Sequence, residues 1–295
     1  MSPPRSVRFR QVDAFTSVPF KGNPLAVVFD ADDFDTAQMQ AIARWTNLSE
    51  TVFLLRPDHP AADYRVRIFT TGGELPFAGH PTLGSAHALC DSGYRPRQPG
   101  RLVQQCGVGL VELTERDHGH WAFAAPPARI TPLPAEHLAT LARALGSDAI
   151  DAAAAPPCTV DNGAPWLVVR MHSAADCLAV RPDPAALAAA TRAAGTHGAA
   201  IYGLHDAGGP AHFEMRCLMT GGDFGLGEDP VTGSANAALA CLLDAQGLRP
   251  ASAYTVRQGT VLERDGRVAI SHDADGRIWI GGDCVTVIEG SFRHP

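Results

Sequence analysis

The sequence predicts an α+β fold of two pseudo-symmetric lobes, in which a curved antiparallel or mixed sheet is wrapped around one central helix in each lobe. Three observations predict it: an internal duplication with a repeat length of about half the chain, a series of strand-like segments in each half, and one helix of small residues in each half. These helices lack a charged face, so they are expected to be buried on all sides, and a surrounding sheet satisfies that requirement.

The duplication is clearest in two segments of equal length. Arg67–Ala88 reads RIFTTGGELPFAGHPTLGSAHA, and Arg216–Ala237 reads RCLMTGGDFGLGEDPVTGSANA, at an offset of 149 without a gap. Nine of the 22 positions are identical, whereas ordinary residue frequencies give about one or two. A weaker echo links GNPLAVV (22–28) to GAPWLVV (163–169). The chain is therefore predicted to be a two-lobed duplicate rather than a solenoid.

Local composition places the elements of the first half, and the second half repeats their order. Thr36–Trp45 has helical spacing, with Asp35 as its N-cap. The helix of small residues is predicted over Pro81–Cys90, and its counterpart over Pro230–Leu243. The segments predicted as strands from their β-branched and aromatic content are Val7–Phe15, Leu25–Phe29, Thr51–Leu55, Tyr64–Phe69, Arg101–Cys106, Val108–Thr114 and Trp121–Ala124.

The predicted domain boundaries follow the duplication. We expect an N-terminal lobe over residues 1–127, completed by a C-terminal strand at 284–295, and a C-terminal lobe over 128–283. The Pro-rich stretch AAPPARITPLP (Ala124–Pro134) is the expected link between the lobes.

Charge and cysteine content exclude several classes of partner. The net charge of −7 and the absence of a basic run argue against nucleic acid or an anionic membrane as partner. No apolar run approaches the roughly 20 residues needed to span a bilayer, and the first residues, MSPPRSVRFRQVDAF, lack a signal-peptide core. The seven cysteines are odd in number and have no CxxC spacing, which favours free thiols in a reducing cytoplasm.

Cofactor chemistry is not predicted either. Lys21 is the only lysine, and its place beside a glycine makes it a poor Schiff-base residue. The chain has no HExxH or CxxC metal motif and no GxSxG elbow, and its GGDFGLG segment lacks the P-loop lysine and the GxGxxG spacing. We therefore expect no metal and no flavin, nicotinamide or pyridoxal cofactor.

A polar residue precedes a proline at the predicted start of each small-residue helix. His80 precedes Pro81 and Asp229 precedes Pro230, and each pair taken singly is read equally well as a simple helix cap. The duplication favours a second reading, in which pseudo-symmetry brings the two helix N-termini together as an anion site for a small carboxylate-bearing ligand. The nearby residues that allow close backbone approach or offer a hydroxyl are Gly79, Gly84, Gly233, Ser85 and Ser234.

Glu50 ends the segment NLSE, directly before the apolar segment TVFLL. An acid in this position is read either as a solvent-facing residue or as a base in the predicted cleft. At the offset of 149 its counterpart is Ala199, so that one half carries an acid that the other lacks. A single carboxylate between two anion-binding helix ends suits proton transfer by one base.

Three long motifs resemble, in order, those of the PhzF-like (phenazine-biosynthesis-like) isomerase family. They are VDAFTSVPFKGNPLAVVFDADDFDTAQMQAIARWTNLSETVFLL, RVRIFTTGGELPFAGHPTLGSAHAL and EDPVTGSANAALA, and the resemblance covers almost the whole chain. It implies a fold like that of diaminopimelate epimerase, a homodimer, and a cofactor-independent isomerase. Family members in the phenazine pathway isomerise dihydro-hydroxyanthranilate by moving a hydrogen between ring carbons.

The resemblance also assigns roles to residues. It implies that Glu50 is catalytic and that His80, Asp229 and Ser234 contact the substrate. We expect Gly79, Gly233 and Ser49 to contact the substrate as well.

Departures from the family pattern leave the substrate open. Thr71 and Thr220 stand where many relatives have proline, and ERDGRV (263–268) replaces the usual GRPS. The racemases of this fold use two helix-start cysteines, and neither helix start has one here. Two alternatives stay open: an epimerase that uses Glu50 with a second acid or base such as His80, and a catalytically silent metabolite-binding protein.

Overall fold

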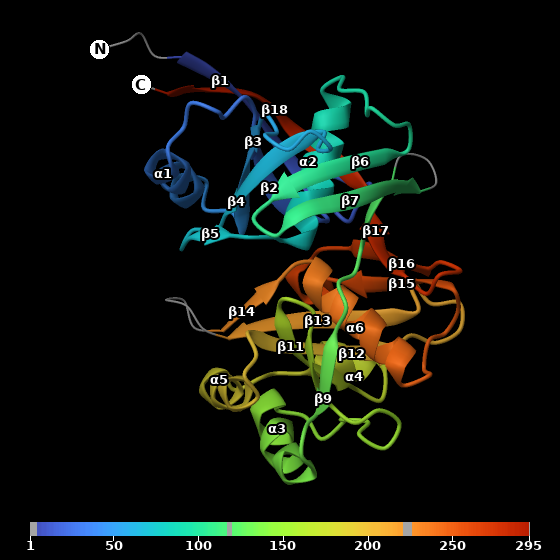
Figure 1. Ribbon diagram of the computed structural model, residues 1–295. Helices are drawn as coiled ribbons and strands as arrows, with labels where there is room; N and C mark the ends of the chain where they lie inside the picture. Colours follow the sequence, from blue (N-terminus) through green and yellow to red (C-terminus); the bar gives the residue numbers. More distant parts are fainter. Residues whose placement is uncertain (1–4, 117–119, 221–225, 295) are drawn as a thin grey trace. The chain divides into compact units, whose positions relative to one another are not determined.

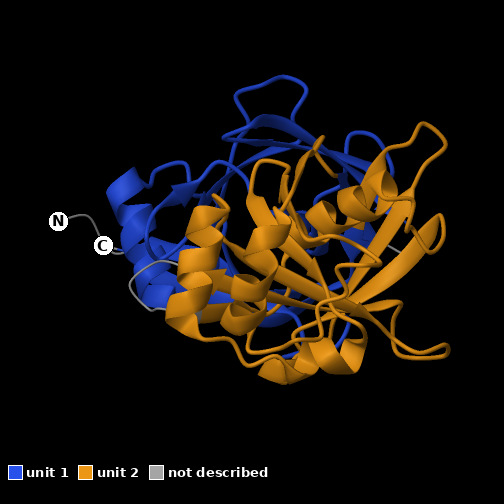
Figure 2. Ribbon diagram, turned by 90° about the horizontal axis from the view of Figure 1, so that it is seen from below, with its two compact units in different colours: residues 1–124, 281–295 blue, residues 125–280 orange. Residues whose placement is uncertain are grey.

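The protein is described by a computed structural model that covers residues 5–116, 120–220 and 226–294. Within these residues it is an α+β protein with eighteen strands and six α-helices (Figure 1). The predicted α+β class is therefore confirmed. The chain divides into two compact units, residues 1–124 with 281–295 and residues 125–280 (Figure 2).

Unit 1 is a mixed sheet with two crossover helices. Its helices are α1 (Thr36–Thr46) and α2 (Gly79–Asp91). Its strands are β1 (Arg5–Ala14), β2 (Asn23–Val28), β3 (Glu50–Leu55), β4 (Tyr64–Phe69), β5 (Glu74–Leu75), β6 (Arg101–Cys106), β7 (Gly109–Arg116), β8 (His120–Ala124) and β18 (Cys284–His294). β1 pairs antiparallel with β2 and β18, so the C-terminal strand belongs to this unit. The pairs β2–β3 and β4–β6 are parallel, because α1 and α2 supply the crossovers that parallel strands need.

Unit 2 repeats this connectivity. Its helices are α3 (Leu138–Leu145), α4 (Ala174–Ala179), α5 (Pro184–Ala193) and α6 (Gly233–Ala245). Its strands are β9 (Arg129–Pro132), β10 (Cys158–Asp161), β11 (Pro165–Arg170), β12 (Gly198–Leu204), β13 (Phe213–Thr220), β14 (Leu226–Asp229), β15 (Ala253–Gln258) and β16 (Gly266–His272); β17 (Ile278–Gly282) spans the boundary between the units. The pairs β11–β12 and β13–β15 are parallel, as are their counterparts in unit 1.

The two helices of small residues are the buried ones, as predicted. Nine of the thirteen residues of α2 are buried, and so are nine of the thirteen of α6. Gly84 shows why the residues are small: a Cβ on it would lie 2.6 Å from Cδ2 of Leu25. A helix that sits so close to its sheet tolerates little more than a hydrogen at this point.

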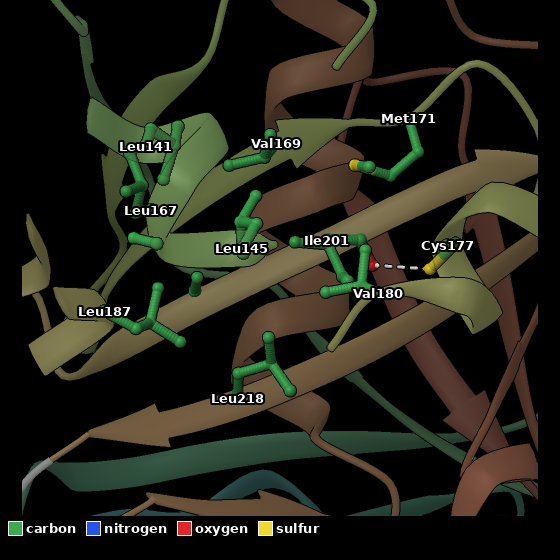
Figure 3. Packing of buried hydrophobic residues seen from close by; sticks show 12 residues of the cluster. Leu141, Leu145, Leu167, Val169, Met171, Cys177, Val180, Leu187, Ile201 and Leu218 are labelled. Atoms are coloured by element: carbon green, nitrogen blue, oxygen red, sulfur yellow. Dashed lines mark hydrogen bonds between the residues drawn. The ribbon is translucent and has the colours of Figure 1, made fainter. Parts of the chain in front are cut away.

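Helices cover both faces of the strands, because neighbouring side chains point in opposite directions. In unit 1, Val27 belongs to the apolar cluster that includes Ala88 of α2, whereas Val28 belongs to the cluster that includes Met39 of α1. In unit 2, residues of α3 and α5 such as Leu141 and Leu187 pack with side chains of β11 and β12 (Figure 3).

Several local predictions are confirmed, and the predicted starts of the two small-residue helices are corrected. β4 and β6 have the predicted bounds, and Asp35 caps α1 in a capping box with Gln38. The predicted link at 124–134 contains β9, which pairs with β10, so part of it is sheet. The first small-residue helix begins at Gly79, earlier than predicted.

The second small-residue helix begins later than predicted, at Gly233 rather than Pro230. Asp229 remains paired with Cys217, and this pairing keeps the chain extended up to that residue. Pro230 therefore lies before the helix. Residues 221–225 of the second repeat lie outside the described residues. Among the residues that are described, none of the helices combines the length and apolar character needed to cross a membrane.

Candidate active site

A carboxyl group and an imidazole meet in unit 1. Glu50 is the first residue of β3, and His80 is the second residue of α2. Glu50 Oε2 lies 3.2 Å from His80 Nε2. Only 15% of the Glu50 side chain and 5% of the His80 side chain are exposed. Two residues that the sequence singled out, 30 positions apart, are therefore in contact and largely withdrawn from water.

His80 is held as a neutral imidazole. Burial lowers its pKa from 6.5 to about 3. Its Nδ1 lies 3.2 Å from Nδ2 of Asn23, the first residue of β2. Because an amide nitrogen only donates, Nδ1 is the acceptor and the ring hydrogen is on Nε2, the nitrogen that faces Glu50. At neutral pH the pair consists of an uncharged N–H donor beside a carboxyl group.

The starts of α2 and α6, like that of α3, lack the side-chain cap found on the other three helices. Asp35, Ser173 and Asp183 cap α1, α4 and α5, each by accepting a backbone N–H. Ala78 and Thr232, the N-cap residues of α2 and α6, make no such bond within the described residues. The first amides of a helix have no partner inside the helix, and the helix dipole adds partial positive charge there. Both helices matched by the duplication therefore keep a start that suits an anion.

The glycines predicted to contact the substrate lie at these helix starts, whereas Ser85 and Ser49 lie elsewhere in unit 1. Gly79 and Gly233 are the first residues of α2 and α6, and both are buried. Ser85 is fully buried, and its Oγ has no hydrogen-bond partner among the described residues. Ser49 is exposed and immediately precedes Glu50 in β3. Of the predicted site residues, Gly79, Ser49, His80 and Glu50 belong to unit 1.

Asp229 and Ser234 belong to unit 2, next to the start of α6. Asp229 ends β14, and its Oδ2 accepts from the Thr232 hydroxyl at 2.5 Å. It is therefore not the N-cap that its position before a proline suggested. Ser234 is the second residue of α6, and its Oγ accepts from Trp166 Nε1 at 3.1 Å.

The register of the strands corrects the counterpart of Glu50. Thr51 pairs with Phe69 in unit 1, and Ala199 pairs with Leu218 in unit 2. Since Phe69 and Leu218 differ by the repeat offset of 149, Ala199 matches Thr51, and Gly198 matches Glu50. The stretch from Ala199 of β12 to Leu218 of β13 is thus one residue longer than the stretch from Thr51 of β3 to Phe69 of β4. The earlier conclusion is unchanged, because neither residue is an acid.

Sequence reasoning missed four residues that hold these groups: Asn23, Trp166, Thr232 and Gln258. The echo between GNPLAVV and GAPWLVV marked the stretches that contain Asn23 and Trp166, although it gave no contact for either. Thr232 lies inside the duplicated segment. Gln258 carried no signal, because its position beside α6 depends on the pairing of β15 with β13.

The described part of the chain contains no cluster of metal-binding side chains. Within the described ranges, no three His, Cys, Asp or Glu side chains are grouped so that they could hold a metal ion. All seven cysteines are free thiols, as predicted. Lys21 is exposed.

The fold and the comparisons with known proteins together define an isomerase. Residues 12–290 match the PhzC-PhzF family, described as phenazine biosynthesis-like protein. The chain belongs to this family, which confirms the resemblance seen in the sequence.

Relatives and solved structures agree with this placement. The chain is 36% identical over 292 residues to antisense-enhancing sequence 1 of Schizosaccharomyces pombe, covering 96% of this chain and 97% of the relative. It is 39% identical over 239 residues to trans-2,3-dihydro-3-hydroxyanthranilate isomerase of Pseudomonas fluorescens, covering 80% and 79%. The crystal structure of a Bacillus anthracis phenazine biosynthesis protein of the PhzF family superposes with a TM-score of 0.85 at 24% identity, covering 98% of this chain and 99% of that one.

Proposed function

We propose that the protein is a cofactor-independent isomerase that moves a proton between carbons of a small carboxylate-bearing substrate, with Glu50 as the base. The observation that carries this proposal is the 3.2 Å contact between Glu50 Oε2 and His80 Nε2 at the uncapped start of α2. A carboxyl group that is mostly buried, with an uncharged donor beside it, suits abstraction of a proton from carbon.

The chemistry follows from these groups. Glu50 takes a proton from a carbon next to a double bond, and the electron pair of the broken C–H bond moves into the conjugated system. Glu50 then returns the proton to another carbon of that system, so that the double bond shifts and no net atom is gained or lost. In this proposal the N–H groups at the helix starts, those of α2 and of α6, hold the substrate carboxylate. His80 places its uncharged Nε2–H group 3.2 Å from Glu50 Oε2.

The relative from Pseudomonas fluorescens is named for trans-2,3-dihydro-3-hydroxyanthranilate. We propose a substrate of the same class, an unsaturated carboxylate with amino or hydroxyl substituents. In this proposal Asp229, Ser234, Gly233, Gly79 and Ser49 contact the substrate. A cytoplasmic homodimer of two-lobed chains stays part of the same proposal, and light scattering of the purified protein tests the dimer.

The epimerase alternative requires a second base. His80 is poorly suited to that role, because burial lowers its pKa to about 3 and a base works best with a pKa near the working pH. The binding-protein alternative predicts that ligands bind and no C–H bond breaks.

Proton NMR in D₂O separates the three functions. The purified enzyme is incubated with trans-2,3-dihydro-3-hydroxyanthranilate and with a panel of unsaturated amino and hydroxy carboxylates. The isomerase predicts a shifted double bond, with hydrogen partly retained at the receiving carbon because one residue carries it. Deuterium exchange with inversion and no shift of the double bond indicates the epimerase. Binding of panel members without any exchange indicates the silent binding protein.

A further inference from the structure

A connected set of hydrogen bonds lies next to Asp229 in unit 2. Gln258 of β15 is fully buried, and its side-chain amide uses both ends. Its Oε1 accepts from Thr232 N and from Asn236 Nδ2, each at 3.0 Å. Its Nε2 donates to Thr232 Oγ1 at 2.9 Å and to the Asp229 carbonyl oxygen at 3.0 Å. One amide thus joins strand β15, the end of β14 and the start of α6.

The direction of each hydrogen bond in this set is fixed by chemistry. A backbone N–H only donates, so the atom of Gln258 that faces Thr232 N is the carbonyl oxygen. The other end of the amide, Nε2, only donates as well, so Thr232 Oγ1 is an acceptor from it. A hydroxyl carries one hydrogen, and that of Thr232 is directed at Asp229 Oδ2, 2.5 Å away.

We infer that Gln258 and Thr232 are positioning residues that hold the Asp229 side chain as a hydrogen-bond acceptor in one orientation. Gln258 Nε2 donates to Thr232 Oγ1, which donates to Asp229 Oδ2, and this chain of two hydrogen bonds is called the relay. The inference rests on the proposed function, in which Asp229 contacts the substrate. An acceptor fixed beside a helix start that suits an anion recognises a carboxylate that carries a neighbouring N–H or O–H donor. The relay therefore selects amino- or hydroxy-substituted carboxylates over plain ones.

The burial of the relay supports this role. Thr232, Asn236 and Gln258 are all buried, and Asp229 is half-buried at the end of the set. A buried network in which every donor has an acceptor keeps its side chains in one arrangement, since any rotation leaves a buried group unpaired. Asp229 is thus oriented before a substrate arrives.

Two stable ligands test the relay by calorimetry. Benzoate has a carboxylate alone, whereas 3-hydroxyanthranilate adds an amino group next to the carboxylate and a hydroxyl group next to that amino group. We expect wild type to bind 3-hydroxyanthranilate more tightly than benzoate. Thr232→Val removes the relay hydroxyl and should raise the Kd for 3-hydroxyanthranilate about tenfold. The Kd for benzoate should change by less than about twofold. Thr232→Ser, which restores the hydroxyl, should recover most of the difference.

Three controls make the result decisive. Thr232→Ala deletes the same hydroxyl without the added methyl group of valine, so its affinities for both ligands should match those of Thr232→Val. It also replaces Thr232→Val if that variant does not fold. In the Asp229→Asn background, Thr232→Val should add little, because the relay no longer has a carboxylate to hold. Thr191→Val removes another buried hydroxyl, one bonded to the Leu187 carbonyl, and should leave both affinities unchanged.

The outcomes separate the inference from the proposed function. If Thr232→Val lowers the affinity for both ligands equally, the residue has a structural role only. The inference of a relay is then wrong, although the carboxylate site stands. If wild type binds neither ligand, the carboxylate site itself fails and the relay fails with it.

Discussion

Gly198 holds in β12 the register position that Glu50 holds in β3. A Cβ at Gly198 would lie 2.3 Å from the carbonyl oxygen of Leu218 and 3.1 Å from the Trp166 ring. The second unit therefore has no room for a side chain at this point. Glu50 therefore has no acidic counterpart at the matching position of unit 2.

Glu50→Gln should keep the fold and ligand binding but lose turnover by about 10²–10⁴-fold. Glutamine has nearly the same volume and still forms hydrogen bonds, but it does not take a proton from carbon at neutral pH. The measurement pairs kcat with benzoate affinity in wild type and variant. Near-normal turnover would move the catalytic role to His80 or Asp229.

Gly198→Ala should lower the free energy of unfolding by about 1–3 kcal/mol, because the new methyl group meets main-chain atoms that cannot rotate away. Gly290→Ala is the matched control, since a Cβ there meets nothing within 4 Å. Urea denaturation measures both variants. Equal stability of the two would show that β12 has more room than the packing indicates.

His80 should make the protein less stable as the pH falls below 6.5. Its pKa is about 3 in the folded protein and 6.5 when exposed, so the unfolded chain binds the proton first. The stabilisation from the neutral imidazole is fully present above pH 6.5 and is lost as the pH falls towards 3. At pH 5 the loss in the free energy of unfolding is about 2 kcal/mol.

Denaturation of wild type and His80→Asn between pH 7 and 5 measures this contribution, and the variant should show the shallower loss. His87 and His272, whose pKa values are also lowered by burial, act equally in both proteins. His137→Asn changes an exposed histidine and should keep the wild-type slope. A wild-type slope in His80→Asn would contradict the assignment.

Cys90→Ala and Cys217→Ala should retain activity. Burial raises the pKa of Cys90 to about 11 and that of Cys217 well above its ordinary range, so neither thiol forms a thiolate at neutral pH. Steady-state kinetics at 25 °C, where both variants should remain folded, provides the measurement. Loss of turnover on alkylation, reproduced by either substitution, would restore a two-thiol mechanism.

Activity should not depend on a metal or an organic cofactor. The expectation follows from the absent ligand motifs and from the single, exposed Lys21. Dialysis against EDTA should leave turnover unchanged, and the absorption spectrum should show only protein bands. Turnover lost on chelation and recovered with one metal would require a different mechanism.

Local patterns were sufficient for many elements. The bounds of Tyr64–Phe69 followed from its β-branched and aromatic residues, and Asp35 followed from its place before a helical repeat, because strand content and capping involve neighbouring residues only. The burial of α2 and α6 followed from their small, uncharged residues. Glu50 and His80 were both expected at the site from the motifs, but the contact between them was not predicted.

The sequence by itself determined the duplication, the order of the elements, the family and the identity of the candidate acid. Only the tertiary structure decided that Gly198 is the counterpart of Glu50, that α6 starts after Asp229, and that His80 is neutral. Strand register, a helix start set by pairing and the desolvation of an imidazole all depend on residues far apart in the chain. Periodicity along the sequence contains no information about such contacts, which form only when the strands and helices pack.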